Sequence, residues 1–353
     1  MSLDGVSVRE KLNNKYNSGR DNNRQELWKV VPRSVPFAIG ITPTDLCNFR
    51  CIYCNQSTEA GIADAKTLSW QEVLVQLGQI EDLLRGEKED LKIIAIHGNG
   101  EPLIHPQIAD IVHEISARNL APRIEITTNG SLLTHSLSDD LISAGLTKII
   151  ISIQGTTSEK YKEICNYSIE IEKLIDELNY FHTKSDGKCR VHIKTLDIAL
   201  NGDEDRERFL NMFSPVCDDI YIEHVMDACG DVDYSQMIKD QDSSNTRFAT
   251  DVIPMKCCNT LFMYLNIHSN GDADCCGCKY PPRYIGNIYK TPMKDLWNGD
   301  VHRELMKMHL EGRRNEIKLC SNCASIEQYN GFKEDVLDDH LEEILHRMQK
   351  LSK

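Results

Sequence analysis

Six apolar runs alternate with helical segments between residues 37 and 224, and this alternation limits the possible folds more than any other feature. Strands that alternate with helices in this way are expected to run parallel and to be joined by right-handed crossovers. The uniformly apolar character of the runs predicts burial on both faces of the sheet. The expected strands are residues 37–41, 91–96, 123–128, 147–153, 189–196 and 219–224.

The segments between these runs carry apolar residues at helical spacing. Ser69 and Glu72 form a capping-box pattern that opens the first helix. Its apolar positions are Trp70, Val73, Leu74, Leu77, Ile80 and Leu84. Further helices are expected around residues 108–115, from about residue 136, between residue 153 and about residue 181, and around residues 205–213. The first 225 residues therefore predict an α/β domain.

Composition narrows the class of protein. Of 353 residues, 41% are hydrophobic and 27% are charged, which is ordinary for a soluble globular enzyme with one large and one smaller domain. The formal net charge of -14 argues against a nucleic-acid or anionic-membrane partner. Residues 1–25 resemble neither a signal peptide nor an anchor, and no apolar stretch has the length of a membrane span. We therefore expect a cytoplasmic protein whose 14 cysteines are metal ligands and free thiols.

Three of these cysteines, Cys47, Cys51 and Cys54, lie within eight residues, directly after the first apolar run and a Thr-Pro-Thr-Asp turn. No fourth Cys or His is close enough in sequence to complete a tetrahedral site. Structural zinc usually has four protein ligands, so three clustered thiols indicate a metal centre with one open position. A zinc loop, or cysteines that are close by coincidence, is the alternative.

This spacing, with Tyr53 before the last cysteine, resembles the CxxxCxxC signature of the radical S-adenosylmethionine (SAM) enzymes. The resemblance implies a 4Fe-4S cluster held by three thiolates, with SAM on the fourth iron. It further implies a 5'-deoxyadenosyl radical that abstracts hydrogen from substrate, and a flavodoxin- or ferredoxin-like electron donor. The family's fold is a partial (β/α)6 barrel, here about residues 37–225, with the site at the carboxyl ends of the strands.

Further segments resemble the family's cofactor motifs. Gly98-Asn-Gly100-Glu101-Pro102 is similar to GGEP, whose carboxylate would receive the methionine ammonium, and Asn129 lies in a TNG-like segment. Each is also compatible with a simple turn. Ser152 belongs to a segment similar to SLDG, in which Gln154 replaces the frequent Asp. Lys194 is a candidate for the methionine carboxylate, although a lone strand lysine more often faces solvent.

A second group of cysteines follows residue 256. Cys258, Gly271, Cys276 and the pair Cys320 and Cys323, with Gly286-Asn-Ile and Leu296-Trp297, resemble the SPASM and twitch domains. No cysteine follows Cys323, so the shorter twitch pattern is favoured. The resemblance implies an auxiliary 4Fe-4S cluster with the ligands Cys258, Cys276, Cys320 and Cys323. The neighbouring cysteines Cys257, Cys275 and Cys278 could be ligands instead, so the choice of ligands stays open. A zinc ribbon with the same four thiolates is the alternative to a cluster.

The chain is thus expected to divide into a lead-in (1–36), a core (37–225), a linker or lid (226–256), an auxiliary domain (257–330) and a C-terminal helix (331–353). The lead-in has a possible helix around residues 24–30. The auxiliary domain should have strands at 260–267 and 272–276 around a Ser-Asn-Gly turn, and helices near 293–297 and 301–310. The C-terminal helix, from about residue 334, has an apolar stripe expected to pack on the barrel, with a dimer contact as the minority interpretation.

These sites favour an enzyme over a metal-binding scaffold. An auxiliary cluster can accept an electron, so we expect dehydrogenation of a small, carbohydrate- or aminocyclitol-like substrate. Epimerisation of a sugar or peptide residue, with Cys229 as hydrogen donor, is the first alternative, and peptide or protein maturation the second. Glu223 and His224, near Asp227, are the candidates for the base. The sequence indicates neither the substrate's identity nor the oligomeric state.

Overall fold

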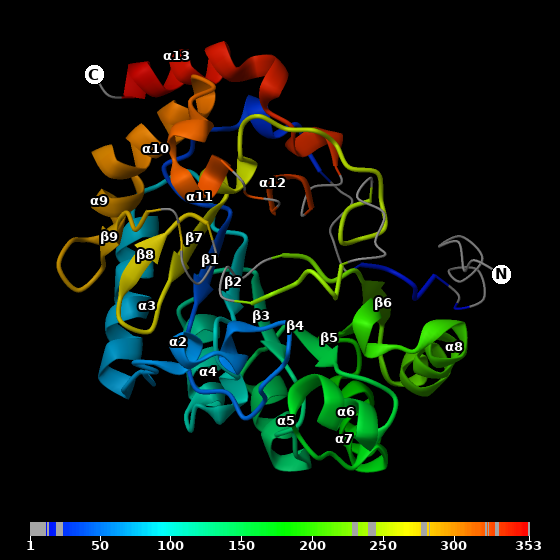
Figure 1. Ribbon diagram of the computed structural model, residues 1–353. Coiled ribbons are helices and arrows are strands. Elements are labelled where there is room, and N and C mark those ends of the chain that lie inside the picture. The colour runs from blue at the N-terminus through cyan, green and yellow to red at the C-terminus, as the bar shows by residue number, and fades with distance from the viewer. Residues whose placement is uncertain are drawn as a thin grey trace.

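The computed structural model describes residues 12, 14–18, 24–227, 232–238, 245–276, 281, 283–321, 323, 325–328 and 332–351. Within these ranges nine strands form one sheet, in the order β6-β5-β4-β3-β2-β1-β7-β8-β9 (Figure 1). Among the described residues β6 and β9, the two ends of this order, do not pair with each other, so the sheet is an open, partial barrel. The strands are β1 Ala38–Ile41, β2 Ile93–Ile96, β3 Arg123–Thr128, β4 Lys148–Ile153, β5 Arg190–Leu196, β6 Asp219–Glu223, β7 Tyr264–Ile267, β8 Asp272–Asp274 and β9 Gly286–Asn287. The six expected parallel strands are confirmed.

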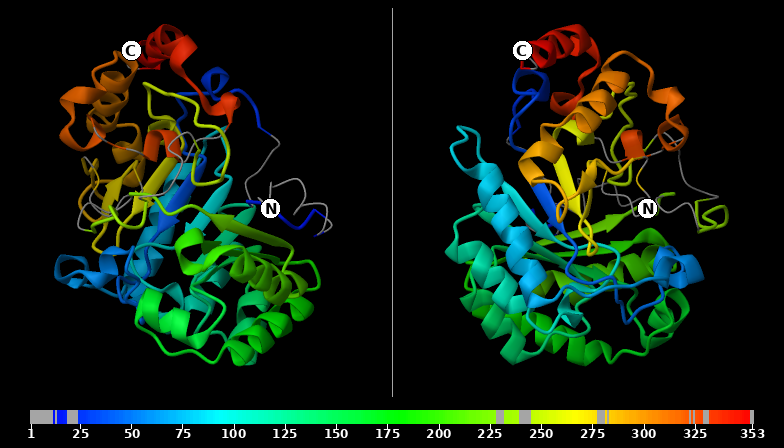
Figure 2. Two further views of the ribbon diagram at one scale, coloured as in Figure 1. Left: turned by 45° about the vertical axis from the view of Figure 1, so that its right-hand side comes forward. Right: turned by 90° about the vertical axis from the view of Figure 1, so that its left-hand side faces the viewer.

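Helices that connect the six strands cover the outer face of the sheet (Figure 2). Helix α3 begins with the expected capping box, in which the Ser69 hydroxyl accepts from the Glu72 N–H and Glu72 accepts from the Ser69 N–H. The connecting helices are α2 Glu59–Ile62, α3 Trp70–Leu84, α4 Ile108–Ala117, α5 His135–Ser143, α6 Ser158–Cys165, α7 Ile171–Ser185 and α8 Gly202–Phe213. The remaining described α-helices are α9 Met293–Trp297, α10 Asp300–Leu310, α11 Lys318–Ser321, α12 Ser325–Gln328 and α13 Leu341–Leu351.

The two faces of the sheet differ in chemistry. Side chains alternate along a strand, and the outward set, such as Ile94, Ile126 and Ile151, is fully buried beneath the helices. The inward set includes charged residues such as Arg123 and Lys148, which line a cavity. Inner residues such as Lys148 and His192 are buried as expected, but this face is polar rather than apolar.

The C-terminal part of the chain continues the same sheet. Strand β7 pairs in parallel with β1, with Ala38 opposite Tyr264 and Ile41 opposite Ile267. Strand β8 then runs back along β7, and Gly271 has φ of +85°, as the expected Ser-Asn-Gly turn requires. Strand β7 is shorter than expected because residues 259–262 form a 3-10 turn, and β8 ends at Asp274.

The terminal helices differ from the expectation. In the lead-in, only a 3-10 turn, Leu27–Lys29, replaces the longer helix. At the C-terminus, two 3-10 turns precede α13, which starts at Leu341 rather than near residue 334. Helix α13 packs on α10 and not on the barrel helices, and Arg347 donates to the Lys29 carbonyl at 3.0 Å. Helix α13 is thereby held against the 3-10 turn Leu27–Lys29 of the lead-in.

No helix among the described residues is long and apolar enough to span a membrane.

Candidate active site

The loop with Cys47, Cys51 and Cys54 follows the carboxyl end of β1. Its backbone is fixed by α6, because the N–H groups of Arg50 and Ile52 donate to the carbonyls of Cys165 and Ile164, both at 2.9 Å. Cys51 is buried, and the other two cysteines are half-buried. The three thiols are therefore held on one short, anchored loop.

The thiols of this loop affect one another electrostatically. Burial, together with negative charge on Glu101, Cys51 and Cys54, raises the pKa of Cys47 to about 12. The Phe49 N–H donates to Cys47 Sγ at 3.4 Å, a bond that stabilises a thiolate. Only a bound cation would make such buried thiols ionise at neutral pH, because metal coordination deprotonates a thiol. The donor set thus fits an iron-sulfur cluster with three protein ligands.

The present side-chain contacts of the thiols are with protein groups. Cys54 Sγ lies 3.3 Å from Asn55 Oδ1, and hydrogen bonding with Cys165 raises the pKa of Cys51. Within the described part of the chain, no three Cys, His, Asp or Glu side chains converge on one point. Bonds to iron would replace these contacts.

The Gly98-to-Glu101 segment packs directly on the cysteine loop. A Cβ on Gly100 would lie 2.2 Å from the Thr44 carbonyl oxygen, so only glycine permits this approach. The Glu101 N–H donates to the Leu46 carbonyl at 2.8 Å. The structure therefore brings together two segments that lie some fifty residues apart in the sequence.

Glu101 is a buried carboxylate that joins two of the expected cofactor segments. It accepts hydrogen bonds from Thr128 Oγ1 at 2.6 Å, from the Asn129 N–H at 2.7 Å and from the Leu103 N–H at 3.0 Å. Burial raises its pKa, although these three bonds act in the opposite direction. Asn129 in turn donates to Asn48 in the cysteine loop at 2.9 Å. A negative charge beside the thiols is suited to an ammonium ligand.

Gln154, whose role was open, holds the aromatic residue of the cysteine motif. Its Oε1 accepts from the Tyr53 hydroxyl at 2.6 Å, and its amide donates to the Ser152 carbonyl at 3.2 Å. Tyr234, from the segment predicted to be a linker or lid, donates to the Tyr53 carbonyl at 2.7 Å. Part of that segment therefore lies against the cysteine loop.

Lys194 is opposite Ser152 in the strand register and faces the inner cavity, not bulk solvent. Its ammonium lies 2.9 Å from Glu223, which also pairs with Arg247. Burial alone would raise the pKa of Glu223, but the two cations lower it to about 2. Glu223 is therefore ionised at neutral pH and is a weak base.

The other candidates near the end of β6 do not converge. His224 Nδ1 lies 2.7 Å from Asp197 Oδ2, so its partner is a neighbouring loop, and Asp227 is exposed. Cys229, the candidate hydrogen donor, lies outside the described residues.

The C-terminal cysteines fall into two groups that differ in solvent exposure. Cys258, Cys276, Cys320 and Cys323 are half-buried, whereas Cys257 and Cys275 are buried in the core. Burial raises the pKa of Cys258, and negative charge on Cys323 acts in the same direction. Arg314 donates to the carbonyls of Cys320 at 2.7 Å and Cys323 at 3.4 Å. Cys278 lies outside the described residues. Four thiols of this kind fit an iron-sulfur cluster, and zinc equally well.

A buried polar network on β7 and β8 was missed by the sequence analysis. His268 Nε2 lies 2.6 Å from Asp274 Oδ2, and Asn266 Nδ2 lies 3.3 Å from the same carboxylate oxygen. Tyr264 bonds to His97, which precedes Gly98. The alternation of Tyr264, Asn266 and His268 along a short strand was the available signal, but only pairing with β1 turns this face toward the site.

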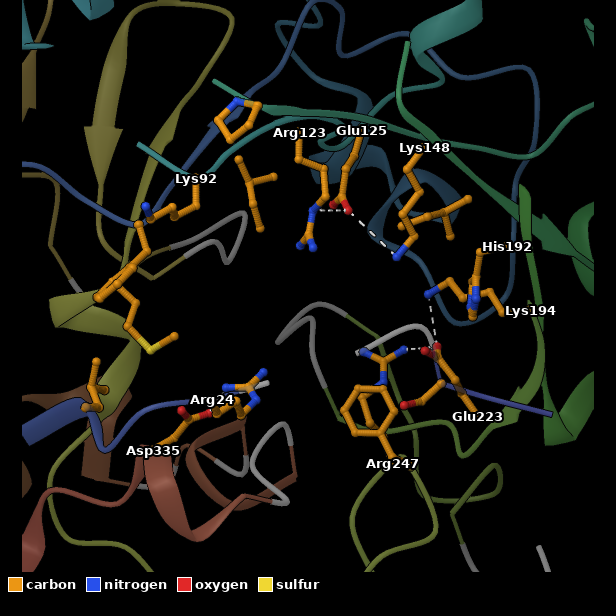
Figure 3. A pocket seen from close by; sticks show the side chains of 18 of the residues that line it. Arg24, Lys92, Arg123, Glu125, Lys148, His192, Lys194, Glu223, Arg247 and Asp335 are labelled. Atoms are coloured by element: carbon orange, nitrogen blue, oxygen red, sulfur yellow. Dashed lines mark hydrogen bonds and ion pairs between the residues drawn. The ribbon is translucent and has the colours of Figure 1, made fainter. Parts of the chain in front are cut away.

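A cavity of about 710 Å³ lies along the inner face of the sheet (Figure 3). Its walls come from the strands on one side and from the N- and C-terminal segments and the 245–248 region on the other. The volume suits a small-molecule ligand. The charged side chains that line it are Arg24, Lys92, Arg123, Glu125, Lys148, Lys194, Glu223, Arg247 and Asp335.

Two family models match the sequence. The Radical SAM superfamily model matches residues 41–212, and the model of an iron-sulfur cluster-binding domain, SPASM, matches residues 257–324. Among curated relatives, the GTP 3',8-cyclase of Clostridium acetobutylicum is 32% identical over 139 residues, which are 39% of this chain and 41% of that protein. The GTP 3',8-cyclase of Alkaliphilus metalliredigens is 38% identical over 125 residues, 35% of this chain and 37% of that protein. The chain thus spans about two fifths of the length of these relatives.

Solved structures with the same fold align over most of the chain. BtrN in complex with AdoMet and 2-DOIA has a TM-score of 0.54 at 18% identity, covering 84% of this chain and 97% of BtrN. SuiB of Streptococcus suis bound to the precursor peptide SuiA has a TM-score of 0.59 at 16% identity, covering 85% and 77%. Native anSMEcpe with bound AdoMet has a TM-score of 0.57 at 14% identity, covering 90% and 100%. The chain belongs to the radical SAM superfamily, with a SAM-binding 4Fe-4S cluster and a C-terminal SPASM iron-sulfur domain.

Proposed function

We propose that this chain is a radical SAM oxidoreductase that converts a secondary alcohol of a small substrate into a ketone. The observation that supports this most is the position of its two cysteine sites. The Cys47 loop follows the carboxyl end of β1, whereas Cys258 precedes the amino end of β7. Because β1 and β7 pair in parallel, the two sites are at opposite ends of these paired strands.

Such an arrangement suits stepwise removal of two electrons. SAM held at the Cys47 loop would supply a 5'-deoxyadenosyl radical as the acceptor for a hydrogen atom from carbon. Formation of a ketone then requires that one electron and the hydroxyl proton leave the substrate radical. An auxiliary cluster held by Cys258, Cys276, Cys320 and Cys323 would receive the electron. The proton requires an acceptor among the protein side chains.

We assign this proton acceptor to His268. Asp274 accepts the hydrogen bond from His268 Nε2, which leaves Nδ1 as the nitrogen that can take a proton. Tyr264, on the same side of this segment as His268, bonds His97, the residue that precedes the Gly98 segment. Glu223, the earlier candidate, is a weak base because Lys194 and Arg247 hold its pKa at about 2.

A peptide is the second candidate substrate. Two structures with this fold contain peptides, SuiB with SuiA and anSMEcpe with the Cp18Cys peptide. Two residues of the segment after β6, Arg247 and Phe248, line the cavity. A long, unstructured chain would have to displace part of this segment, which favours a small molecule.

The test is anaerobic turnover with candidate alcohols. Reconstituted protein should hold about eight irons, and a substrate should stimulate release of 5'-deoxyadenosine and lose two hydrogens in its product. Incorporation of solvent deuterium at carbon, without net oxidation, would instead indicate epimerisation. The control is a variant with Cys47, Cys51 and Cys54 changed to Ala. If iron-loaded wild-type protein releases no more 5'-deoxyadenosine than this control, the proposal is wrong.

A further inference from the structure

Two buried histidines lie on the same face of α10, and they differ in how their ring nitrogens are bonded. His302 Nδ1 lies 2.6 Å from the Trp297 carbonyl oxygen, and its Nε2 lies 2.8 Å from the Leu261 carbonyl oxygen. His309 follows two turns further along the helix and is 1% exposed. Among the described residues, its Nε2 is buried and has no hydrogen-bond partner. An unpartnered polar atom at such depth indicates a partner from outside the chain.

The bond at the other ring nitrogen decides which form of His309 the protein holds. The Cys258 N–H donates to His309 Nδ1, with 3.3 Å between the two nitrogens. A nitrogen that accepts a hydrogen bond carries no proton, so the proton of the ring must be on Nε2. An imidazole that ligates a metal usually has the reverse arrangement, in which the second nitrogen donates. Nε2 of His309 is therefore a hydrogen-bond donor and not a metal ligand.

The segment that holds His309 also contacts three of the four proposed cluster ligands. His309 accepts the hydrogen bond from Cys258. Arg314, five residues further on, donates to the carbonyls of Cys320 at 2.7 Å and Cys323 at 3.4 Å. The backbones of these three cysteines are thus fixed by the end of α10 and the turn that follows it. The Nε2–H of His309 belongs to the same short segment.

We propose that His309 Nε2 donates a hydrogen bond to a sulfur atom of the auxiliary cluster. This inference rests on the proposed function, because that function assigns the cluster to Cys258, Cys276, Cys320 and Cys323. Hydrogen bonds to the sulfur atoms are among the features that set the reduction potential of an iron-sulfur cluster. A donated N–H stabilises the additional negative charge of the reduced cluster, so it raises this potential. His309 would thereby favour transfer of the single electron that the substrate radical must lose.

The test is a redox titration of the auxiliary cluster, followed by EPR, in full-length protein with Cys47, Cys51 and Cys54 changed to Ala. This background removes the SAM-binding cluster, so the signal comes from the auxiliary cluster. His309→Phe keeps a ring but removes the donor. It should make reduction less favourable by about tenfold, which lowers the potential by about 59 mV for one electron. His309→Gln, whose amide supplies an N–H in place of the ring, should retain most of the potential.

Two further measurements keep the test independent of damage to the fold. His302→Phe is the matched control, because it removes a buried imidazole from the same helix about 10 Å from His309. It should cost stability but leave the potential unchanged. In the same cysteine-to-alanine background with both histidines intact, an isotopic nitrogen label in histidine should give a weak hyperfine coupling to the reduced cluster. A ligand nitrogen would give a strong coupling.

The outcomes separate this inference from the proposed function. An unchanged potential in His309→Phe, an equal shift in His302→Phe, or no histidine coupling would overturn the hydrogen bond and leave dehydrogenation standing. A strong coupling, with loss of iron in His309→Phe, would make His309 a ligand and overturn the hydrogen bond as well. Zinc in place of iron in this background would overturn both proposals. Neither measurement requires substrate, so a lowered potential in His309→Phe without substrate oxidation by wild-type protein would keep the hydrogen bond and remove the dehydrogenase.

Discussion

The hydroxyl oxygen of Tyr264 occupies the space that a side chain on Gly40 would need. An ideal Cβ on Gly40 would lie 2.0 Å from this oxygen and 2.7 Å from Asn266 Oδ1. Without that Cβ, Tyr264 reaches over β1 to bond His97 at the end of β2. The seam between β1 and β7, which joins the two cysteine-bearing parts of the chain, is thus built around one glycine.

Changing Gly40 to Ala should therefore weaken this seam. We expect the free energy of unfolding to fall by about 1–3 kcal/mol, because Tyr264 must leave its position and its bond to His97. Gly78 is the matched control, since a Cβ there meets nothing within 4 Å and the residue lies within α3. Gly78→Ala should increase stability by up to about 1 kcal/mol. Denaturant titrations measure both, and equal effects would contradict the role of Gly40.

Glu101→Gln should abolish the negative charge beside the cysteine loop while keeping the buried shape. We expect SAM affinity to fall at least about tenfold with iron content unchanged, because an ammonium loses its charged partner. Glu304→Gln, at an exposed position on α10, is the control. Equilibrium binding of SAM to iron-loaded protein measures the effect, and unchanged affinity would exclude Glu101 as a ligand for SAM.

The same variant should alter the dependence of stability on pH. Burial raises the folded-state pKa of Glu101, so the proton is held more tightly in the folded protein than in the unfolded chain. Its contribution to stability is thus complete below the unfolded pKa of about 4.5 and is lost as pH rises through the folded pKa. Glu101→Gln cannot ionise, so its stability relative to wild type should increase from pH 4 to pH 7. A constant difference would contradict this prediction.

Glu223 should behave in the opposite way. Its pKa falls from 4.5 to about 2, so it stabilises the protein above pH 4.5, and this contribution is lost as pH falls toward 2. Glu223→Gln leaves Lys194 and Arg247 without their shared carboxylate and should cost about 3 kcal/mol at pH 7. Unfolding experiments between pH 3 and pH 7 should show the gap between variant and wild type closing as pH falls.

The proposed ligand Cys258 is half-buried, whereas its neighbour Cys257 is fully buried. Cys258→Ser should lower the iron content from about eight to about four, because the auxiliary cluster loses a thiolate. Cys257, which is fully buried, should retain iron when changed to Ser and instead lose about 1–3 kcal/mol of stability. Iron analysis and thermal unfolding of the two variants distinguish these outcomes, and the reverse pattern would make Cys257 the ligand.

Replacement of His268 should uncouple the cleavage of SAM from the formation of product. His268→Gln should lower the rate of product formation by about 100-fold or more, because the hydroxyl proton has no acceptor. Cleavage of SAM to 5'-deoxyadenosine should continue, since it precedes that step. His224, which follows β6, was the histidine expected from the sequence to act as the base. His224→Gln should have only a small effect on the rate of product formation. If His224→Gln produced the larger loss, the assignment of the two histidines would be reversed.

Local patterns predicted the elements well because they depend on neighbours in the sequence. The Ser69 capping box, the turn at Gly271 and the helix Met293–Trp297 all formed as expected. The predicted C-terminal helix begins before the observed one, because the residues ahead of Leu341 form 3-10 turns instead. In one of these turns, Asp338 accepts hydrogen bonds from the Lys256 and Cys257 N–H groups. That contact joins residues some eighty positions apart, so helical periodicity could not reveal it.

The sequence by itself determined the alternation of strands and helices, the spacing of the cysteines and hence the superfamily, because each is a property of short stretches. Only the tertiary structure decided that β7 pairs with β1 and that Arg123, Lys148 and Arg247 surround one cavity. These relationships depend on strand register and on how the two ends of the chain fold over the sheet. The sequences of the apolar strands do not reveal which face of the sheet the helices cover and which face lines the cavity. The face that lines the cavity decides which side chains can contact a ligand.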